Sequence, residues 1–317
     1  MRVAVTGASG FVGGVVSEAL LRRGHDVLAL SRRPVRPRSG LEHRRWDLTS
    51  GPLPEPGAVD AVVHVAAHVD EWDPWPVHEA VTVEGTRSVL RTWPHARIVL
   101  VSSCSVYPLR APHAPRHRLT EAVPVTSRPL SAYSRAKAAQ ERLVLAREDA
   151  VVLRPHAVHG PGDTTLLPRL ERARRRGLLL CPGSPSTRLH LTDVSLVAEA
   201  AAAACEAGSC TGVLNVADAA PLRLAEVVAG VAAANAWTER PVFTGTPAAW
   251  VAALLLEGAA RAAGSTTAPL LTAYAVSHLA VSREFDTTRL RTQLGVEPRP
   301  TDLSRWHPGP TAHDSHA

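Results

Sequence analysis

A glycine-rich turn near the start of the chain limits the fold to a narrow class. The apolar segment Arg2–Thr6 predicts a strand, and residues 11–23 predict a helix with one apolar face. At their junction the sequence reads TGASGFVG, which gives Gly7, Gly10 and Gly13 the spacing of a dinucleotide-binding fingerprint. Such glycines permit a tight turn, close approach of a pyrophosphate, and close helix–strand packing. We therefore expect a pyrophosphate at the N-terminus of this helix, with a plain strand-to-helix turn as the alternative.

Short apolar runs then alternate with helical patterns through the first half of the chain. The segments expected to be strands are residues 26–30, 60–65, 97–102 and 150–154, and the expected helices are residues 77–92 and 131–147. This alternation predicts an α/β fold with a Rossmann-type doubly wound parallel sheet. Residues 1–157 would form the dinucleotide-binding domain, completed by segments around residues 192–217.

A smaller C-terminal substrate-binding lobe is expected at residues 158–305, where short strands alternate with helical segments. These helical segments are residues 166–176, 196–207, 224–234 and 248–263. The segment 248–263 is apolar on one side, and we interpret it as a packed amphipathic helix, with a membrane-surface or apolar-substrate role as the alternative. Residues 306–317 predict a disordered tail.

The positive charge of the chain does not indicate a nucleic-acid partner. The 35 basic residues exceed the 29 acidic ones by six, but the arginines are scattered and no aromatic residues are interleaved with them. The arginine run at residues 172–176 continues a helical pattern and predicts a solvated helix face. No apolar run of about 18 residues predicts a membrane span.

The four cysteines lack CxxC spacing, and the N-terminus lacks a secretion signal, so we expect reduced thiols and a cytoplasmic protein. Among the 15 histidines, the pairs His64/His68 and His156/His159 have no carboxylate or cysteine at usable spacing. No metal site is therefore expected.

The only lysine of the chain stands four residues after one of its three tyrosines. On a predicted helix this spacing puts the Tyr133 phenol and the Lys137 ammonium on one face. A phenol with a pKa of about 10 is a poor acid–base catalyst at neutral pH, but an adjacent ammonium and an oxidised nicotinamide would lower that pKa. An ammonium can also bridge two ribose hydroxyls, where a guanidinium fits badly. The alternative interpretation is a surface pair.

Serine hydroxyls follow the strand expected at residues 97–102. Ser102, Ser103 and Ser105 lie where that strand ends, and ligands of open α/β sheets bind at the carboxyl ends of the strands. A serine there can hydrogen-bond a substrate oxygen beside the tyrosine and stabilise a developing alkoxide.

The residues after the second strand favour NADP(H) over NAD(H). An acidic residue at this position binds the adenosine ribose of NAD, whereas this chain has Ser31, Arg32 and Arg33. A hydroxyl and guanidinium groups would accept a 2′-phosphate, although the arginines could simply reflect an arginine-rich background. Asp47, after the third strand, could accept a hydrogen bond from the adenine amino group or be an ordinary solvated acid.

These motifs together resemble the extended short-chain dehydrogenase/reductase family, also called the NAD-dependent epimerase/dehydratase family. Its patterns match in order and spacing over almost the whole chain: TGASGFVG, DAVVHVAA, VEGT, SSCSVY, YSRAK, LRPHAVHGPGD, RLHLTDV and GVLNVAD. The resemblance implies Tyr133 as the acid–base residue, Lys137 as ribose binder and pKa modulator, and Ser103 as the third catalytic residue.

The resemblance also implies a set of cofactor-binding residues and a homodimer through the helices at residues 77–92 and 131–147. Ala66 and Ala67 match the loop beside the cofactor, and Pro155 and Val158 match the backbone near the nicotinamide. The full set is Gly7, Gly10, Phe11, Val12, Ser31, Arg32, Arg33, Asp47, Leu48, Ala66, Ala67, Tyr133, Lys137, Pro155 and Val158.

Departures from the family patterns narrow the expected reaction. Thr82 stands where the family usually has asparagine, so local support of the active site differs. Cys104 and Ser105 replace the Asp-Glu pair of nucleotide-sugar dehydratases, which argues against dehydration. Residues 186–189 lack the Arg-Asp pair common in nucleotide-sugar epimerases, which weakens sugar-nucleotide binding.

The C-terminal stretch at residues 269–295 looks like the 3β-hydroxysteroid dehydrogenase-like branch, which acts on bulky, apolar ketones or alcohols. Trp72 and Trp75 could form a wall of such a pocket or be ordinary loop residues. We therefore expect an NADP(H)-dependent oxidoreductase that interconverts a ketone and a secondary alcohol on a small apolar, steroid-like, lipid-like or secondary-metabolite substrate. The alternatives are a nucleotide-sugar 4-epimerase or 4-ketoreductase and a non-catalytic NADP(H)-binding sensor.

Overall fold

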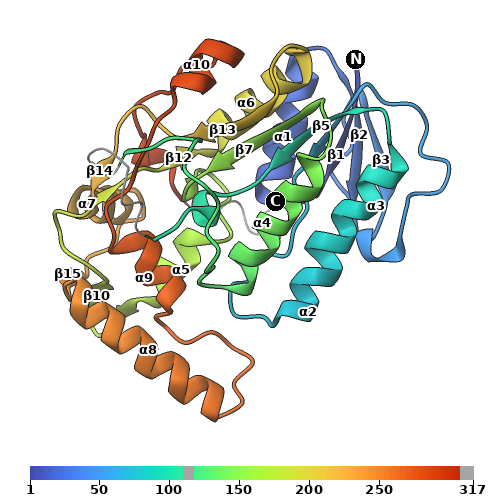
Figure 1. Ribbon diagram of the computed structural model, residues 1–317. Helices are drawn as coiled ribbons and strands as arrows, with labels where there is room; N and C mark the ends of the chain where they lie inside the picture. Colours follow the sequence, from blue (N-terminus) through green and yellow to red (C-terminus); the bar gives the residue numbers. More distant parts are fainter. Residues whose placement is uncertain (110–117, 308–317) are drawn as a thin grey trace, which may run out of the picture.

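The computed structural model describes residues 1–109 and 118–307. Its centre is a seven-stranded sheet in which all neighbouring strands are parallel (Figure 1). In spatial order the strands are β13 (Gly212–Val216), β7 (Ala150–Pro155), β5 (Arg97–Val101), β4 (Ala61–His64), β1 (Arg2–Thr6), β2 (Asp26–Ser31) and β3 (Leu41–Arg45). The expected α/β class with a Rossmann-type sheet is confirmed.

The strand order reverses next to β1. The chain runs outward from β1 through β2 to β3, and then builds β4, β5, β7 and β13 on the other side. Ligands of open parallel sheets bind beyond the carboxyl ends of the strands at such a reversal. Thr6 ends β1 and pairs with His64 at the end of β4, so both lie at the edge where a ligand is expected.

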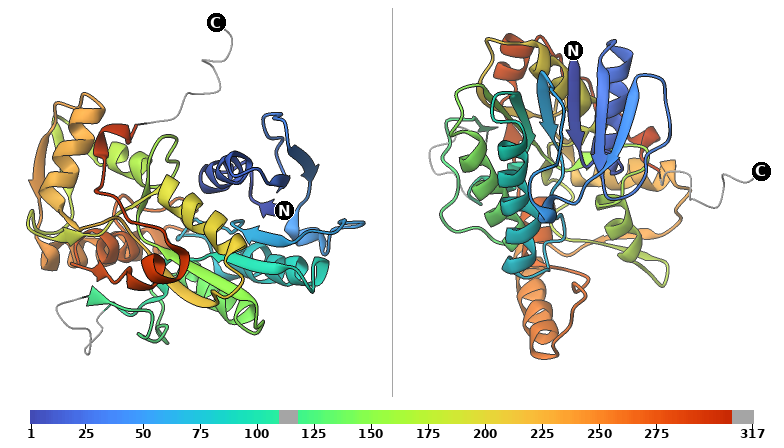
Figure 2. Two further views of the ribbon diagram at one scale, coloured as in Figure 1. Left: turned by 90° about the horizontal axis from the view of Figure 1, so that it is seen from above. Right: turned by 90° about the vertical axis from the view of Figure 1, so that its right-hand side faces the viewer.

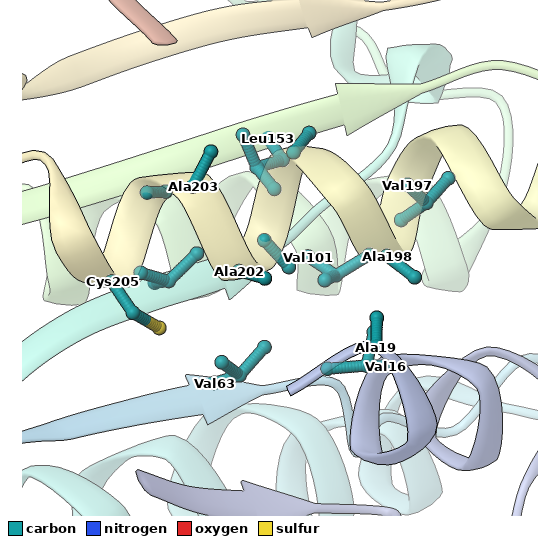
Figure 3. Close-up of a cluster of buried hydrophobic side chains, with 14 of the residues drawn as sticks. Val16, Ala19, Val63, Val101, Leu153, Val197, Ala198, Ala202, Ala203 and Cys205 are labelled. Carbon is teal, nitrogen blue, oxygen red and sulfur yellow. The ribbon is translucent and has the colours of Figure 1, made fainter. Parts of the chain in front are cut away.

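Helices cover both faces of this sheet (Figure 2). The helices α1 (Phe11–Arg22) and α6 (Val194–Glu206) share one buried cluster with the strands, while α3 (Gly85–Thr92) and α4 (Ala132–Val144) contribute to the cluster on the other face. The small side chains of α6, among them Ala198 and Ala202, lie between the sheet and α1 (Figure 3). Because alanine adds little bulk, α6 can pack closely against both neighbours.

The helix expected at residues 77–92 has a wider turn in its middle. It begins as α2 (Trp75–His78), continues through a π-helical turn, η2 (Glu79–Glu84), and ends as α3. The π-helical turn packs against α4, the helix that carries Tyr133. Such turns inside helices occur frequently at functional sites.

A second body of structure follows β7 in the chain. Its largest sheet pairs β10 (Leu178–Cys181) with β15 (Arg240–Phe243) in parallel and with β9 (Arg174–Arg175) in antiparallel. Its helices are α5 (Leu166–Arg172), α7 (Leu224–Ala234), α8 (Thr246–Ala262) and α9 (Ala273–Leu279), while α10 (Thr288–Leu294) packs Leu290 into the buried cluster of the large sheet and α6. None of the described helices is both long and apolar enough to cross a bilayer.

Short elements connect the two parts. Three small pairs of strands are β8 (Val158–His159) with β12 (Thr192–Asp193), β11 (Arg188–Leu189) with β14 (Leu222–Arg223), and β6 (Arg118–Leu119) with β16 (Glu284–Phe285). The short 3₁₀ turns are η1 (Leu48–Ser50), η3 (Cys104–Val106) and η5 (Leu303–Arg305). Through the pair β6–β16, the chain just before α10 lies beside the loop that follows β5.

The prediction of one helix over residues 166–176 is wrong at its C-terminal end. The helix stops at Arg172, and Arg174 lies in β9. Arg176 and Gly177 both have positive φ, at 49° and 77°, as the two central residues of a type I′ hairpin turn require. Arg174 pairs with Glu239, so this arginine run is not a single solvated helix face.

At the periphery, the expected tail begins too early, and the expected amphipathic helix at residues 248–263 is packed on one side only. Trp306, placed at the start of the tail, is fully buried, and its indole Nε1 donates to Asp163 Oδ2 at 2.9 Å; residues 308–317 of that tail lie outside the described residues. The helix α8 is present as expected and packs Ala253 into a small cluster with α9. Its opposite side is not packed, since Leu254 and Leu255 are 60% and 69% exposed.

Candidate active site

The glycine turn between β1 and α1 fits a dinucleotide because its own backbone excludes side chains there. Gly7 has a φ of 71°, and a Cβ added to Gly13 would lie 2.2 Å from the Gly7 carbonyl oxygen. A Cβ on Gly7 would lie 3.0 Å from the backbone nitrogen of Ala66, in the loop after β4. The N-terminus of α1 therefore approaches the ends of β1 and β4, and its free N–H groups favour an anion such as a pyrophosphate.

A buried hydrogen-bond network fixes the loop that contains Ala66. The Thr6 hydroxyl lies 2.7 Å from His64 Nδ1 and accepts hydrogen bonds from the backbone nitrogens of Val65 and Ala66, both at 3.2 Å. Burial lowers the pKa of His64 to about 3, so this imidazole is neutral. Its other nitrogen lies 3.0 Å from the hydroxyl of Thr86 on α3.

This network continues to the single lysine. Gln140 of α4 donates to Thr86 at 2.9 Å and accepts from Lys137 Nζ at 3.0 Å. Lys137 Nζ also donates to the carbonyl of Val101, at the end of β5, at 2.9 Å. Sequence reasoning missed the roles of His64, Thr86 and Gln140. These residues belong to β4, α3 and α4, and they contact one another only in the folded chain.

Lys137 is a buried cation that lacks an acidic hydrogen-bond partner among the described residues. Burial lowers its pKa to about 8, while the more distant Glu141 acts in the opposite direction. Glu141 is itself engaged by Arg154, 2.6 Å away, in an ion pair whose side chains are both buried. An ammonium has three donors, and the two acceptors Val101 O and Gln140 Oε1 leave one donor of Lys137 for a further group.

Tyr133 and Ser103 lie together at the carboxyl end of β5. Tyr133 is in the first turn of α4, whose N-terminus is capped by the Ser131 side chain accepting from the Ser134 backbone nitrogen at 3.1 Å. Ser103 follows β5 and caps η3 in the same manner. A hydrogen bond with Ser103 lowers the pKa of Tyr133, but burial dominates and raises that pKa to about 12.

Aromatic rings surround the Tyr133 phenol. The rings of His78 and Tyr274 pack edge-on against it, with centroids 6.4 and 6.0 Å away. Tyr274 comes from α9, so residues far apart in the sequence enclose one site. The ion pair of Arg169 with Glu71 also acts electrostatically on Tyr133. Tyr274 was missed as a site residue, although it is one of only three tyrosines.

The residues expected at the adenosine end lie along the carboxyl edge of β2 and β3. The hydroxyl of Ser31 is buried and donates to the Arg33 carbonyl oxygen at 2.6 Å. Arg32 and Arg33 are exposed, and the Arg33 guanidinium reaches the Ser9 carbonyl of the glycine turn at 3.5 Å. Asp47 accepts from the Thr49 backbone and hydroxyl, which lowers the pKa of its carboxyl.

The other predicted cofactor residues follow the same edge of the sheet. Phe11 and Val12 are half-buried at the start of α1, and Leu48 is buried beside Gly85. Pro155 ends β7, and Val158 begins β8 three residues later. With Ala66 and Ala67 after β4, these residues follow strands β1, β3, β4 and β7 of the sheet, and their contact with a cofactor stays a prediction.

The two tryptophans after β4 contact neighbouring elements through their rings. Trp72 Nε1 donates to the Ser265 carbonyl at 3.0 Å, which links this loop to the segment after α8. The Arg135 guanidinium lies over the Trp75 ring, 3.7 Å from its centroid. Neither contact decides whether a tryptophan forms a wall of a substrate pocket. Among the described residues, no group of three or more His, Cys, Asp or Glu side chains is placed to bind a metal ion.

Comparison with known proteins agrees with this geometry. A 2-alkyl-3-oxoalkanoate reductase of Stenotrophomonas maltophilia is 33% identical over 244 residues, which cover 72% of this chain and 74% of that protein. A 3 beta-hydroxysteroid dehydrogenase/Delta 5-->4-isomerase of Mycobacterium tuberculosis is 29% identical over 326 residues, covering 94% and 86%. The structure of MoeE5 in complex with UDP-glucuronic acid and NAD is similar with a TM-score of 0.73 and 25% identity, covering 96% and 97%.

The family comparison extends over most of the chain. The model of the NAD dependent epimerase/dehydratase family matches residues 3–217, which include the glycine turn, Ser103, Tyr133 and Lys137. The same region forms the parallel sheet and its helices. This chain therefore belongs to the NAD-dependent epimerase/dehydratase family, the extended short-chain dehydrogenases/reductases, and is an NAD(P)-dependent enzyme of that type.

Proposed function

We propose that this enzyme interconverts a ketone and a secondary alcohol on a small apolar molecule, with NADP(H) as its preferred cofactor. The observation that carries this proposal is the hydrogen bond between Ser103 and Tyr133 at the carboxyl end of β5, with the buried Lys137 on the next turn of α4. A hydroxyl, a phenol and an ammonium in this arrangement can bind a carbonyl oxygen and deliver a proton to it.

In the reductive direction the residues act on the substrate oxygen. When bound, the cofactor supplies the hydride that adds to the carbonyl carbon. Ser103 donates a hydrogen bond to the carbonyl oxygen, and Tyr133 transfers its proton to that oxygen as negative charge develops. The product is a secondary alcohol, and one proton is consumed. Lys137 stabilises the resulting phenolate and provides its remaining donor to a ribose hydroxyl.

The preference for NADP(H) is supported by the exposed guanidinium groups of Arg32 and Arg33 at the end of β2. Arg33 already reaches the glycine turn, so it lies near the expected adenosine ribose. No acidic side chain follows β2 to repel a 2′-phosphate. The Ser31 hydroxyl is engaged by the backbone, so the two arginines carry this argument.

The substrate class is supported by the names of the relatives. Reductases of 2-alkyl-3-oxoalkanoates and a 3 beta-hydroxysteroid dehydrogenase both act on carbonyl or hydroxyl groups of largely apolar molecules. A nucleotide-sugar 4-epimerase or 4-ketoreductase is the second candidate, favoured by the likeness to MoeE5 in complex with UDP-glucuronic acid and NAD. Binding of a panel of sugar nucleotides to the NADP⁺-loaded protein would distinguish the two.

Replacement of the phenol tests the proposed chemistry. Tyr133→Phe should abolish oxidation of NADPH or NADH by a panel of ketones of rising size, and NADPH binding measured by fluorescence should be nearly unchanged. Tyr107→Phe is the matched control for loss of a phenol hydroxyl, because the Tyr107 hydroxyl donates to Asn215 at 2.7 Å rather than to Ser103 or Lys137. Turnover retained by Tyr133→Phe would refute the assignment of Tyr133. A wild-type protein that binds NADPH without oxidation by any ketone would favour the sensor alternative.

A further inference from the structure

Three arginines of the described chain are buried, and two of them form an ion pair with a carboxylate. Arg97 forms an ion pair with Asp149 and donates to three backbone carbonyls of the α6–β13 connection. Arg154 makes two hydrogen bonds to the buried carboxylate of Glu141, at 2.6 and 2.9 Å. Such pairing is expected, because a buried charge without a partner is strongly unfavourable.

Arg283 is the exception. It is 5% exposed, and no ion pair or side-chain hydrogen bond to a described residue is found for it. Its Nε is buried without a partner, and burial lowers the pKa of its guanidinium. The groups that act electrostatically on its guanidinium are the Cys104 thiol and the Tyr274 phenol. Burial raises the pKa of both groups, so neither carries a negative charge at neutral pH. The segment at residues 110–117, which the structure does not describe, contains no Asp or Glu in its sequence.

The Arg283 side chain lines a small polar pocket, which we call the Arg283 pocket. Three serine hydroxyls and the ring of Tyr274 share its wall, and the exposed Arg128 also lines it. The polar residues of its wall include Ser105, Arg128, Ser134, Tyr274, Ser277 and Arg283. A guanidinium beside the Ser105 hydroxyl, which has no partner among the described residues, is suited to an anion.

This pocket is adjacent to the catalytic residues. Ser105 follows Ser103 by two residues in η3, and Ser134 follows Tyr133 directly in α4. Tyr274 connects the two places, since its ring packs against Tyr133 and also lines the Arg283 pocket. The pocket therefore shares η3, α4 and Tyr274 with the proposed catalytic residues.

The other arginine near Tyr133 does not compete for this role. Arg169 acts electrostatically on Tyr133 and Tyr274, but it already forms an ion pair with the buried carboxylate of Glu71. An anion at Arg169 would have to displace that carboxylate. No carboxylate among the described residues pairs with Arg283, so an incoming anion would neutralise its charge without breaking an ion pair of that part of the chain.

We propose that the Arg283 pocket binds a carboxylate of the substrate, so that the enzyme acts on oxo acids or hydroxy acids with an apolar chain. This inference rests on the proposed function and names its substrate class. The planar guanidinium matches a carboxylate with two parallel hydrogen bonds, and the Ser105 hydroxyl, which has no partner among the described residues, supplies a further donor. The carboxylate orients the substrate, while the hydride and proton transfers at the carbonyl remain as described above.

A matched pair of substrates tests the proposal. Wild-type enzyme should reduce 3-oxodecanoate with a higher kcat/KM than its methyl ester, which has the same chain and ketone but no charge. Arg283→Gln should lower kcat/KM for the acid by about 30-fold or more, as loss of a buried charge pair implies, and change the value for the ester little. Arg283→Lys should restore part of the preference for the acid over the ester, because lysine keeps the positive charge but lacks the two parallel N–H donors of a guanidinium.

Controls separate a binding defect from misfolding. Arg118→Gln removes an exposed arginine of β6 and should leave the preference for the acid unchanged. Each variant is checked for NADPH binding and for its thermal midpoint. The Arg283→Gln protein should fold, because no acid loses its partner in that variant.

Binding of decanoate to the NADP⁺-loaded protein, measured by calorimetry, tests the Arg283 pocket separately from the ketoreductase function. Binding to wild type and not to Arg283→Gln supports the pocket even if no ketone is reduced, an outcome that would refute the proposed function alone. Equal kcat/KM values for the acid and the ester in wild type, or an unchanged preference in Arg283→Gln, would overturn the Arg283 proposal and leave the ketoreductase function standing.

Discussion

The single lysine permits a direct measurement of the electrostatics at the active site. Lys137 is buried, and its pKa is lowered from 10.5 to about 8 by loss of hydration. The unfolded chain therefore binds more protons than the folded one between about pH 8 and pH 10.5. In this window the contribution of Lys137 to the free energy of unfolding rises with pH, and below pH 8 the buried ammonium disfavours the cofactor-free fold.

The size of the Lys137 contribution to the unfolding free energy follows from the difference between its pKa in the unfolded and the folded chain. Each pH unit above the folded-state pKa adds about 1.4 kcal/mol until the unfolded pKa is reached. Between about pH 7 and pH 9.5 the Lys137 contribution should thus increase by about 2 kcal/mol. Burial raises the pKa of Tyr133 and of thiols such as Cys205, and these groups lower stability at high pH. The lysine contribution is therefore obtained as a difference between wild type and Lys137→Met.

Two assays measure this prediction. Incorporation of ¹³Cε-lysine gives one lysine resonance, since the chain has no other lysine, and its titration midpoint reports the pKa of Lys137. Urea unfolding of the cofactor-free proteins across the same pH range gives the difference in unfolding free energy. A midpoint near that of a solvated lysine, together with a difference that does not change with pH, would refute the description of Lys137 as an uncompensated buried cation.

Two further predictions concern the glycine turn and the buried ion pair. Gly13→Ala should abolish NADPH binding measured by fluorescence, because the new Cβ would lie 2.2 Å from the Gly7 carbonyl oxygen. Gly14→Ala is the control and should bind NADPH normally, because its nearest contact would be at 3.6 Å. Equal affinities of the two variants would show that the turn can relax. Arg154→Met should lower the urea-derived unfolding free energy by about 3–5 kcal/mol, because Glu141 keeps a buried charge, and a loss below about 1 kcal/mol would contradict that expectation.

The central fold was predictable because it depends on local patterns. The apolar runs that became β1, β4 and β5, with the glycines between β1 and α1, identify a parallel sheet without long-range information. The hairpin of β9 and β10 was missed because arginine is a good helix former and the run continued the spacing of α5. Only the pair Arg176–Gly177 signalled a turn, and a non-glycine residue at positive φ is rarely assumed from sequence.

The candidate site was predictable only in part. Ser103, Tyr133 and Lys137 stand in recognisable motifs, and the structure brings Ser103 to Tyr133. Trp306 and Arg283 gave no such signal. A tryptophan near a chain end with no apolar neighbours looks like part of a tail, yet it fills a space beside Asp163. An arginine in an arginine-rich chain looks like a surface residue, and only the fold shows that it is buried.

Among the described residues, Lys137 of α4 and Arg283, just before β16, are buried cations that lack an acidic hydrogen-bond partner. A chain that places arginine at almost every basic position has no structural reason to bury either charge without compensation, because an apolar residue of similar size would give a more stable protein. Both costs are reduced when ligands bind: Lys137 gains polar acceptors, and Arg283 gains a negative charge. The cost of burying these charges and the proposed chemistry thus have one physical origin, the placement of cations without an acidic partner near the proposed active site.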